Sequence, residues 1–122
     1  MAVEVEGTDE FQDWFDSLSD AERRDVIAAI DYLELKGIAL GFPRSSDVKG
    51  SRHSHMRELR IQHAGRPYRV LYAFDPRRTA ILLLGGDKTG DDRWYETNVP
   101  IADDRYDEYL DELRRERLIS DA

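Results

Sequence analysis

The sequence contains no cysteine, and this absence excludes several kinds of site. Disulfide bonds, thiolate nucleophiles and cysteine-ligated metal centres all require a thiol. A chain without disulfides suits a reducing compartment, and we predict a cytoplasmic location. Four prolines and eight glycines among 122 residues leave most of the chain free for helices and strands.

Long hydrophobic runs are also missing. The longest strongly apolar stretch is AILLL at 80–84, whereas a bilayer-spanning helix needs about 20 such residues. The opening residues MAVEVEGTDEF lack the basic and apolar segments of a signal peptide. We therefore predict a soluble protein with no membrane partner. Its 122 residues suit one domain, 1–122, which is long enough to bury a hydrophobic core without disulfide or metal cross-links.

Positive charge is scarce overall, and it is concentrated in the middle of the chain. The net charge of −8 argues against a nucleic-acid partner. From Arg44 to Arg93, however, 11 Lys and Arg stand against 6 Asp and Glu, and all three histidines fall there. The remaining residues carry 7 Lys and Arg against 20 Asp and Glu. This asymmetry indicates either a basic site or ordinary solvated helix faces.

The first third of the sequence predicts a short strand and two helices. Residues 2–6 alternate apolar and acidic residues, as in a strand. Thr8 is a suitable N-cap for a first helix, and Ser19 to Glu22 has the form of a capping box that opens a second one, which Gly37 ends. The two predicted apolar stripes are Phe11, Trp14, Phe15 and Leu18, then Val26, Ile27, Ile30 and Leu33. We expect the two helices to pack as an antiparallel hairpin.

The rest of the sequence predicts a loop, three strands and a last helix. Residues 37–56 lack periodicity, and strands follow at 57–63, 66–74 and 79–85, the last apolar on both faces and therefore central. After a loop at 85–102, Asp103 or Asp104 should cap a helix with the stripe Tyr106, Tyr109, Leu110 and Leu113. The predicted order is β-α-α-β-β-β-α, an α+β fold with helices packed on a small antiparallel sheet.

The predicted hairpin around Ala64-Gly65 brings two arginines together. A two-residue loop there places His63 opposite Arg66 and Arg60 opposite Arg69. Opposed side chains share a face with Cβ atoms about 5 Å apart, where like charges destabilise. Two explanations stay open, because Glu58 on the same face could form a local ion pair, or the guanidinium groups could bind a phosphate.

Further cations are expected at the same end of the sheet. The strand at 79–85 should run back toward the Ala64-Gly65 end, and Lys88 follows it closely. We therefore predict that Arg60, Arg66, Arg69 and Lys88 converge. The inference depends on the register, because a slip of one residue moves a side chain to the other face.

Other motifs in the sequence give weaker support for a functional site. His53 and His55 could form one edge of a metal site, but no third ligand is evident, so a surface histidine pair is the preferred interpretation. Gly85-Gly86 lacks the context of a phosphate-binding loop, and no nucleophile elbow supports a Ser-His-Asp site. We predict neither a metal nor a cofactor.

Three segments together resemble a known family. The runs MRELRI, YRVLYAF and AILLLGGDK are similar to those of HigB-type toxins of the RelE superfamily, and the resemblance extends over most of the chain. It implies a metal-free endoribonuclease that cuts messenger RNA in the ribosomal A site and so inhibits translation. It also implies a cognate antitoxin, often a helix-turn-helix DNA-binding protein. The alternative is a catalytically inactive toxin fold that binds an antitoxin or another partner through its acidic last helix.

The resemblance also suggests which residues act. Arg60 matches the arginine of ELR, Arg69 that of YRVLY, and Lys88 the lysine after the last strand, so these three are the predicted catalytic residues together with Tyr95. The two arginines would stabilise charge on the scissile phosphate. Lys88, Tyr95 or a nearby histidine would transfer the protons, and these assignments stay open. The predicted RNA contacts are Arg57, His63, Arg66 and Arg93.

Overall fold

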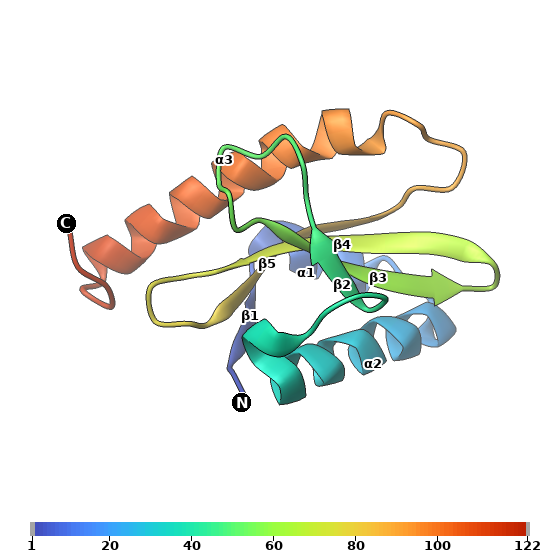
Figure 1. Cartoon of the computed structure of the whole chain (residues 1–122), viewed down its shortest axis with the longest axis horizontal. Helices are drawn as coiled ribbons and strands as arrows, with labels where there is room; N and C mark the ends of the chain where they lie inside the picture. Colours follow the sequence, from blue (N-terminus) through green and yellow to red (C-terminus); the bar gives the residue numbers. More distant parts are fainter. Residues whose placement is uncertain (1, 122) are drawn as a thin grey trace.

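The computed structural model describes residues 2–121 of the chain (Figure 1). Its elements are β1 (Val5–Gly7), α1 (Asp9–Asp16), α2 (Asp20–Lys36), the 3-10 turn η1 (Gly37–Ala39), β2 (Ser45–Asp47), β3 (Arg57–His63), β4 (Arg66–Phe74), β5 (Ala80–Asp87) and α3 (Trp94–Arg115). The predicted order of helices and strands is confirmed, with β2 and η1 as additions. None of the helices within 2–121 has the length and apolar character needed to cross a bilayer.

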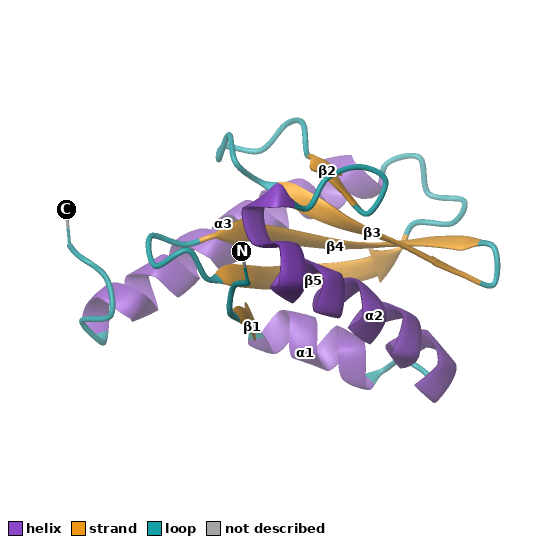
Figure 2. Cartoon of the chain, turned by 60° about the horizontal axis from the view of Figure 1, so that its bottom comes forward, coloured by secondary structure: helices purple, strands orange, loops and turns teal. Residues whose placement is uncertain are grey.

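The five strands form one sheet in the order β1-β5-β4-β3-β2, with helices on both faces (Figure 2). Helices α1 and α2 cover one face, where the core includes Phe11, Val26, Leu33, Leu59 and Val70. Helix α3 covers the other, where the core includes Leu71, Ile81, Leu83, Trp94 and Tyr106. Strands β4 and β5 are therefore buried on both sides, as the apolar run at 79–85 predicted.

The N-caps predicted for α1 and α2 are confirmed. The Thr8 side chain accepts a hydrogen bond from the Phe11 amide, and the Ser19 and Glu22 side chains form the reciprocal capping box. One core prediction is wrong, because Ile27 is 45% exposed while its neighbour Val26 is fully buried. Adjacent helical residues point about 100° apart, so the residue next to the centre of the stripe faces away from the sheet.

The sheet differs from the predicted one at its two edges. Strand β2, inside the predicted loop 37–56, pairs antiparallel with β3. Its three residues, Ser-Ser-Asp, are too few and too polar to show a strand pattern. Strand β1 pairs parallel with β5, so the sheet is mixed and only the β2–β5 part is antiparallel. That pairing joins distant segments, and no local pattern indicates its direction.

Helix α3 begins at Trp94, earlier than the predicted cap at Asp103 or Asp104. Asp103 is 2% exposed and lies inside the helix rather than at its start. Pro100 lies in the second turn, where it removes one backbone hydrogen bond. Burial of Trp94, Val99 and Ala102 against the sheet offsets that loss.

Two adjacent glycines in β5 allow this start of α3. A Cβ atom on Gly86 would lie 2.8 Å from the Trp94 indole nitrogen, and one on Gly85 would lie 2.3 Å from the Trp14 ring. The strand thus accepts an indole on each face. The packing of Trp94 fixes the first turn of α3 over the sheet, and with it the next residue, Tyr95.

Candidate active site on the α3 face of the sheet

The predicted pairing of the two arginines is confirmed. Arg60 lies opposite Arg69 and His63 opposite Arg66, and Ala64 and Gly65 have the positive φ angles of a two-residue hairpin loop. The Arg60 amide donates to the Arg44 carbonyl outside the hairpin, so Arg60 and Arg69 form a non-hydrogen-bonded pair. Such pairs have the closest side chains in an antiparallel ladder, about 4.5 Å between Cα atoms.

A single carboxylate, Glu58, lies between these two cations. It is 5% exposed, and it belongs to the same face of β3 as Arg60. Its Oε2 atom accepts hydrogen bonds from Ser46 Oγ at 2.7 Å and from Arg60 Nη1 at 3.2 Å. Its Oε1 atom accepts from the Tyr95 hydroxyl at 2.5 Å and lies 3.4 Å from Arg69 Nε. The local ion pair is therefore present, and it also holds the second arginine and a tyrosine.

Arg69 is held beneath this carboxylate. Its side chain is 7% exposed, against 31% for Arg60, and Nη1 donates to its neighbour's carbonyl, that of Tyr68, at 3.0 Å. A buried charge is stable only when it is paired and hydrogen-bonded. Arg69 is therefore a fixed positive charge under the surface, and Arg60 is the guanidinium that solvent reaches.

Tyr95 and Lys88 complete this end of the sheet. The Lys88 amide donates to the Pro67 carbonyl at 3.0 Å, and Lys88 Nζ lies 5.7 Å from the centre of the Tyr95 ring. Lys88 therefore lies at the predicted end of the sheet, with its side chain beside Tyr95. Burial raises the pKa of the Tyr95 hydroxyl, and the hydrogen bond to Glu58 and its negative charge raise it further. The phenol therefore stays protonated and donates to Glu58.

Three of the predicted RNA contacts lie on the other face of the sheet. Side chains alternate along a strand, so Arg57 and His63 of β3 and Arg66 of β4 point toward α2 and not toward α3. The predicted convergence of Arg66 with Arg60 and Arg69 is therefore wrong. His63 lies opposite Arg66 in the register, but three positions from Arg60, and an odd separation changes the face.

Acidic side chains pair with these three residues on the α2 face. Arg57 bonds to Asp47, His63 Nδ1 lies 2.6 Å from Asp25 Oδ2, and Arg66 lies 3.2 Å from Asp87 and 3.8 Å from Glu22. Arg93, the fourth predicted contact, is exposed immediately before α3. Of the four, it alone lies outside the β3–β4 hairpin.

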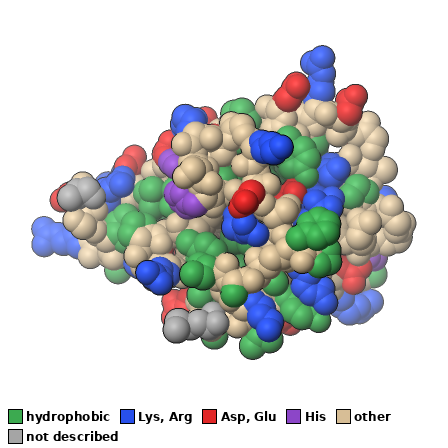
Figure 3. Space-filling model, in the orientation of Figure 1, with side chains coloured by type: hydrophobic (Ala, Val, Ile, Leu, Met, Phe, Trp, Pro, Cys, Tyr) green, Lys and Arg blue, Asp and Glu red, His purple; other side chains and the backbone are tan. Residues whose placement is uncertain are grey.

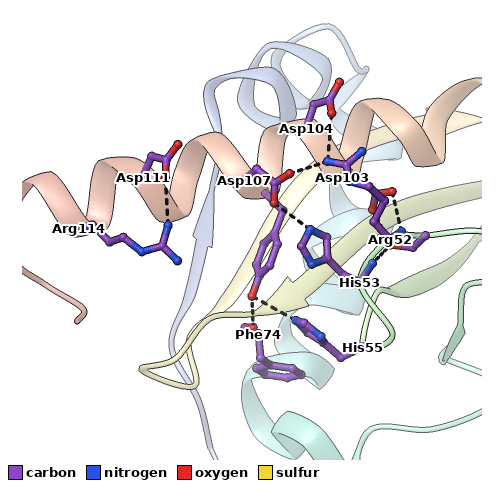
Figure 4. Close-up of polar contacts among 11 residues, drawn as sticks. Arg52, His53, His55, Phe74, Asp103, Asp104, Asp107, Asp111 and Arg114 are labelled. Atoms are coloured by element: carbon purple, nitrogen blue, oxygen red, sulfur yellow. Dashed lines mark hydrogen bonds and ion pairs between the residues drawn. The ribbon is translucent and has the colours of Figure 1, made fainter. Parts of the chain in front are cut away.

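The two remaining histidines join the loop 48–56 to α3, as Figure 4 shows. His53 Nε2 lies 2.9 Å from Asp107 Oδ1, and His55 Nε2 lies 3.2 Å from the Tyr106 hydroxyl. Burial and the charge of His53 lower the pKa of His55. Within residues 2–121, no group of three or more His, Cys, Asp or Glu side chains is arranged to hold a metal ion.

Two residues of the site carried little or no sequence signal. Glu58 was recognisable as a neighbour of Arg60, because residues two apart share a strand face, but its contacts with Arg69 and Tyr95 were not. Ser46 gave no signal at all, since it reaches Glu58 only through the unpredicted strand β2. Figure 3 shows acidic, basic and hydrophobic side chains intermixed on one face of the molecule.

Comparisons with known proteins agree on one family. Residues 13–107 match the family described as phage derived protein Gp49-like. The chain is 49% identical over 98 residues to a Mycobacterium tuberculosis protein that carries the name toxin HigB3, covering 80% of this chain and 84% of that protein. It is 43% identical over 99 residues to one named toxin HigB2 from the same organism, of which it spans 49%.

Two solved structures share the fold. A double mutant of the E. coli toxin RelE, solved in the free state, matches 81% of this chain and 95% of its own, with a TM-score of 0.54 and 12% identity. The Pyrococcus horikoshii OT3 RelE–RelB complex contains a chain that matches 74% of this chain and 99% of its own, with a TM-score of 0.52 and 19% identity. At these identities the likeness concerns the fold.

Proposed function

This chain belongs to the Gp49-like family and is a HigB-type toxin of the RelE superfamily, and on this premise we propose that it cleaves messenger RNA on the ribosome as the toxin of a type II toxin–antitoxin pair. The observation that carries the proposal is the cluster on the α3 face, where Arg60 and Arg69 share the one carboxylate of Glu58 beside Tyr95 and Lys88. Two guanidinium groups and a nearby ammonium group against one carboxylate leave this cluster with a net positive charge.

The proposed reaction is attack of an RNA 2′-hydroxyl on the adjacent phosphorus atom. The bond from phosphorus to the 5′-oxygen breaks as the new bond forms, so negative charge develops on the phosphoryl oxygens. Arg60 is placed to contact those oxygens. Arg69 is a buried, fixed positive charge that stabilises the developing negative charge without having to reorient during the reaction. Orientation of the RNA by the ribosome would supply a further part of the rate.

Two protons must move in that step, and Tyr95 and Lys88 are the candidates to move them. One group accepts the proton of the 2′-hydroxyl, and another donates a proton to the departing 5′-oxygen. Lys88 Nζ beside the Tyr95 ring is a suitable donor, and the Tyr95 hydroxyl, bonded to Glu58, is placed to pass a proton to that carboxylate. No step in this scheme needs a metal ion or another cofactor held by the chain.

The proposed partners are the ribosome, its bound message and a cognate antitoxin in the cytoplasm. The chain of the P. horikoshii RelE–RelB complex shows that a protein of this fold forms such a pair. Because Arg60 is the more exposed of the two arginines, an acidic antitoxin segment over Arg60 would neutralise the toxin. Its association should then weaken as salt is raised.

Two observations favour a second function. Both arginines are already paired with Glu58, and a chain with a net charge of −8 is poorly suited to RNA. On this alternative the chain is an inactive toxin fold that binds an antitoxin or another protein.

Controlled expression separates the two functions. The chain is induced in bacterial cells with and without the adjacent antitoxin gene, and growth and the 5′ ends of cellular messages are recorded. The nuclease should arrest growth and produce new ends within codons, and an Arg60→Ala/Arg69→Ala double variant should do neither. Growth that continues at the normal rate with intact messages, while the folded chain accumulates, would support the binding module and overturn the nuclease.

A further inference from the structure

A pocket adjoins the cluster on the α3 face. Its volume is about 300 Å³, and it is lined by Lys49, Gly50, Tyr95, Glu96, Val99 and Pro100. One wall is therefore the loop 48–56, and the other is the first two turns of α3. None of the catalytic assignments above uses its lining residues apart from Tyr95.

Both walls of this pocket are held in place by buried contacts. On the loop side, Ser51 Oγ and the Arg52 amide donate to the Asp103 carboxylate at 2.5 and 2.9 Å, and Asp103 is 2% exposed (Figure 4). On the helix side, Tyr95 is held by its hydroxyl bond to Glu58. The pocket is thus built into the fold, and its aromatic wall belongs to the proposed active site.

The chemistry of the lining suits an unpaired nucleobase. Tyr95 supplies a π face, and Val99 and Pro100 supply apolar surface beside it. Stacking of a base on an aromatic side chain contributes to binding for every base. The pocket adds a cation, Lys49, which suits a phosphate, and a carboxylate, Glu96, which accepts hydrogen bonds from amino groups. A purely apolar ligand would leave both charges unused.

We infer that this pocket binds one base of the cleaved codon, next to the scissile phosphate, and that Glu96 selects among bases. Cytosine, adenine and guanine carry an exocyclic amino group that can donate to Glu96, whereas uracil has only its N3–H donor, which lies between two carbonyl oxygens that the carboxylate repels. Lys49 contacts the adjoining phosphate and does not discriminate between bases. The inference rests on the proposed nuclease function and adds a specificity pocket to it.

The test maps cleavage sites in a reconstituted translation system programmed with messages of mixed codon content. Glu96→Gln replaces an acceptor-only group by an amide that can donate to a carbonyl. Cleavage at codons with uracil at the selected position should then rise about tenfold relative to codons with the other bases, which is the discrimination typical of one such contact. Glu34→Gln, an exposed glutamate of α2, is the matched control and should leave the codon profile unchanged.

A second variant tests the phosphate contact. Lys49→Ala should lower the cleavage rate by a similar factor at all codons, and Lys36→Ala at the end of α2 is its control. Thermal melts confirm that each variant is folded. An unchanged codon profile in Glu96→Gln overturns the pocket assignment while wild-type cleavage leaves the nuclease standing. Altered antitoxin affinity without any codon change would assign the pocket to a protein contact and also overturn it. If the wild-type chain does not cleave at all, the nuclease fails and the pocket assignment fails with it.

Discussion

The two faces of the β3–β4 hairpin carry similar residues but balance their charges differently. On the α2 face, Arg57, His63 and Arg66 each have at least one acidic partner of their own. On the α3 face, Arg60 and Arg69 share Glu58 alone, and Lys88 is beside them. The first face is therefore close to neutral, and the second keeps a positive charge for a ligand. A count of cations along the sequence would treat the two faces alike.

The largest expected effect follows from removing the shared carboxylate. Glu58→Ala leaves the buried Arg69 without a counter-ion, and losing one member of a buried pair costs about 3 to 5 kcal/mol of unfolding free energy. Denaturant titration measures that cost, and the cleavage assay should show activity falling with it. Glu58→Gln is the milder comparison, because its amide still accepts from Tyr95. A Glu58→Ala protein as stable as the wild type would show that Arg69 does not depend on this pair.

Arg69→Ala should have the next largest effect, and mainly on activity. A cation fixed near a developing phosphoryl charge is worth about 3 kcal/mol, or roughly a hundredfold in rate. Stability should change less than in Glu58→Ala, because Glu58 keeps its contacts with Arg60, Ser46 and Tyr95 while the like-charge repulsion disappears. The measurements are cleavage of ribosome-bound message and a thermal melt. Normal cleavage by this variant would remove Arg69 from the site.

Arg66→Ala tests the opposite face and should have a small effect. Arg66 is exposed and its partners Asp87 and Glu22 face solvent in part, so the pair contributes about 0 to 1 kcal/mol. Cleavage should continue at the wild-type rate, since the side chain points toward α2. A loss of cleavage comparable with that of Arg69→Ala would contradict the division of the hairpin into two faces.

The smallest effect is a pH dependence on the α2 face. Hydrogen bonds from Tyr68 and from Ser19 lower the pKa of Glu22 from 4.5 to about 2. Because the folded pKa lies below the unfolded one, this stabilisation is complete above about pH 4.5 and is lost as the pH falls toward 2. Glu22→Gln should therefore weaken the decline in unfolding free energy over that range, as measured by denaturant titration at several pH values. An identical decline in both proteins would assign it to other carboxylates.

Local features of the sequence predicted a large part of this fold. The caps at Thr8 and Ser19, the stop at Gly37 and the hairpin at Ala64-Gly65 depend on a few adjacent residues, and all are confirmed. The start of α3 was not predictable in this way. It depends on Trp94 packing against Gly86, a contact that compensates for Pro100 inside the helix.

In the candidate site, too, some features follow from the local sequence and others only from tertiary packing. Alternation along β3 and β4 is a local property, so the sequence by itself determined that Arg60, Arg69 and Glu58 share a face. Only the tertiary structure decided which face α3 covers, how deeply Arg69 is buried, and that Tyr95 and Ser46 reach the same carboxylate. The physical reason is that strand alternation and turns are decided by neighbouring residues, whereas burial and counter-ions depend on which distant elements pack together.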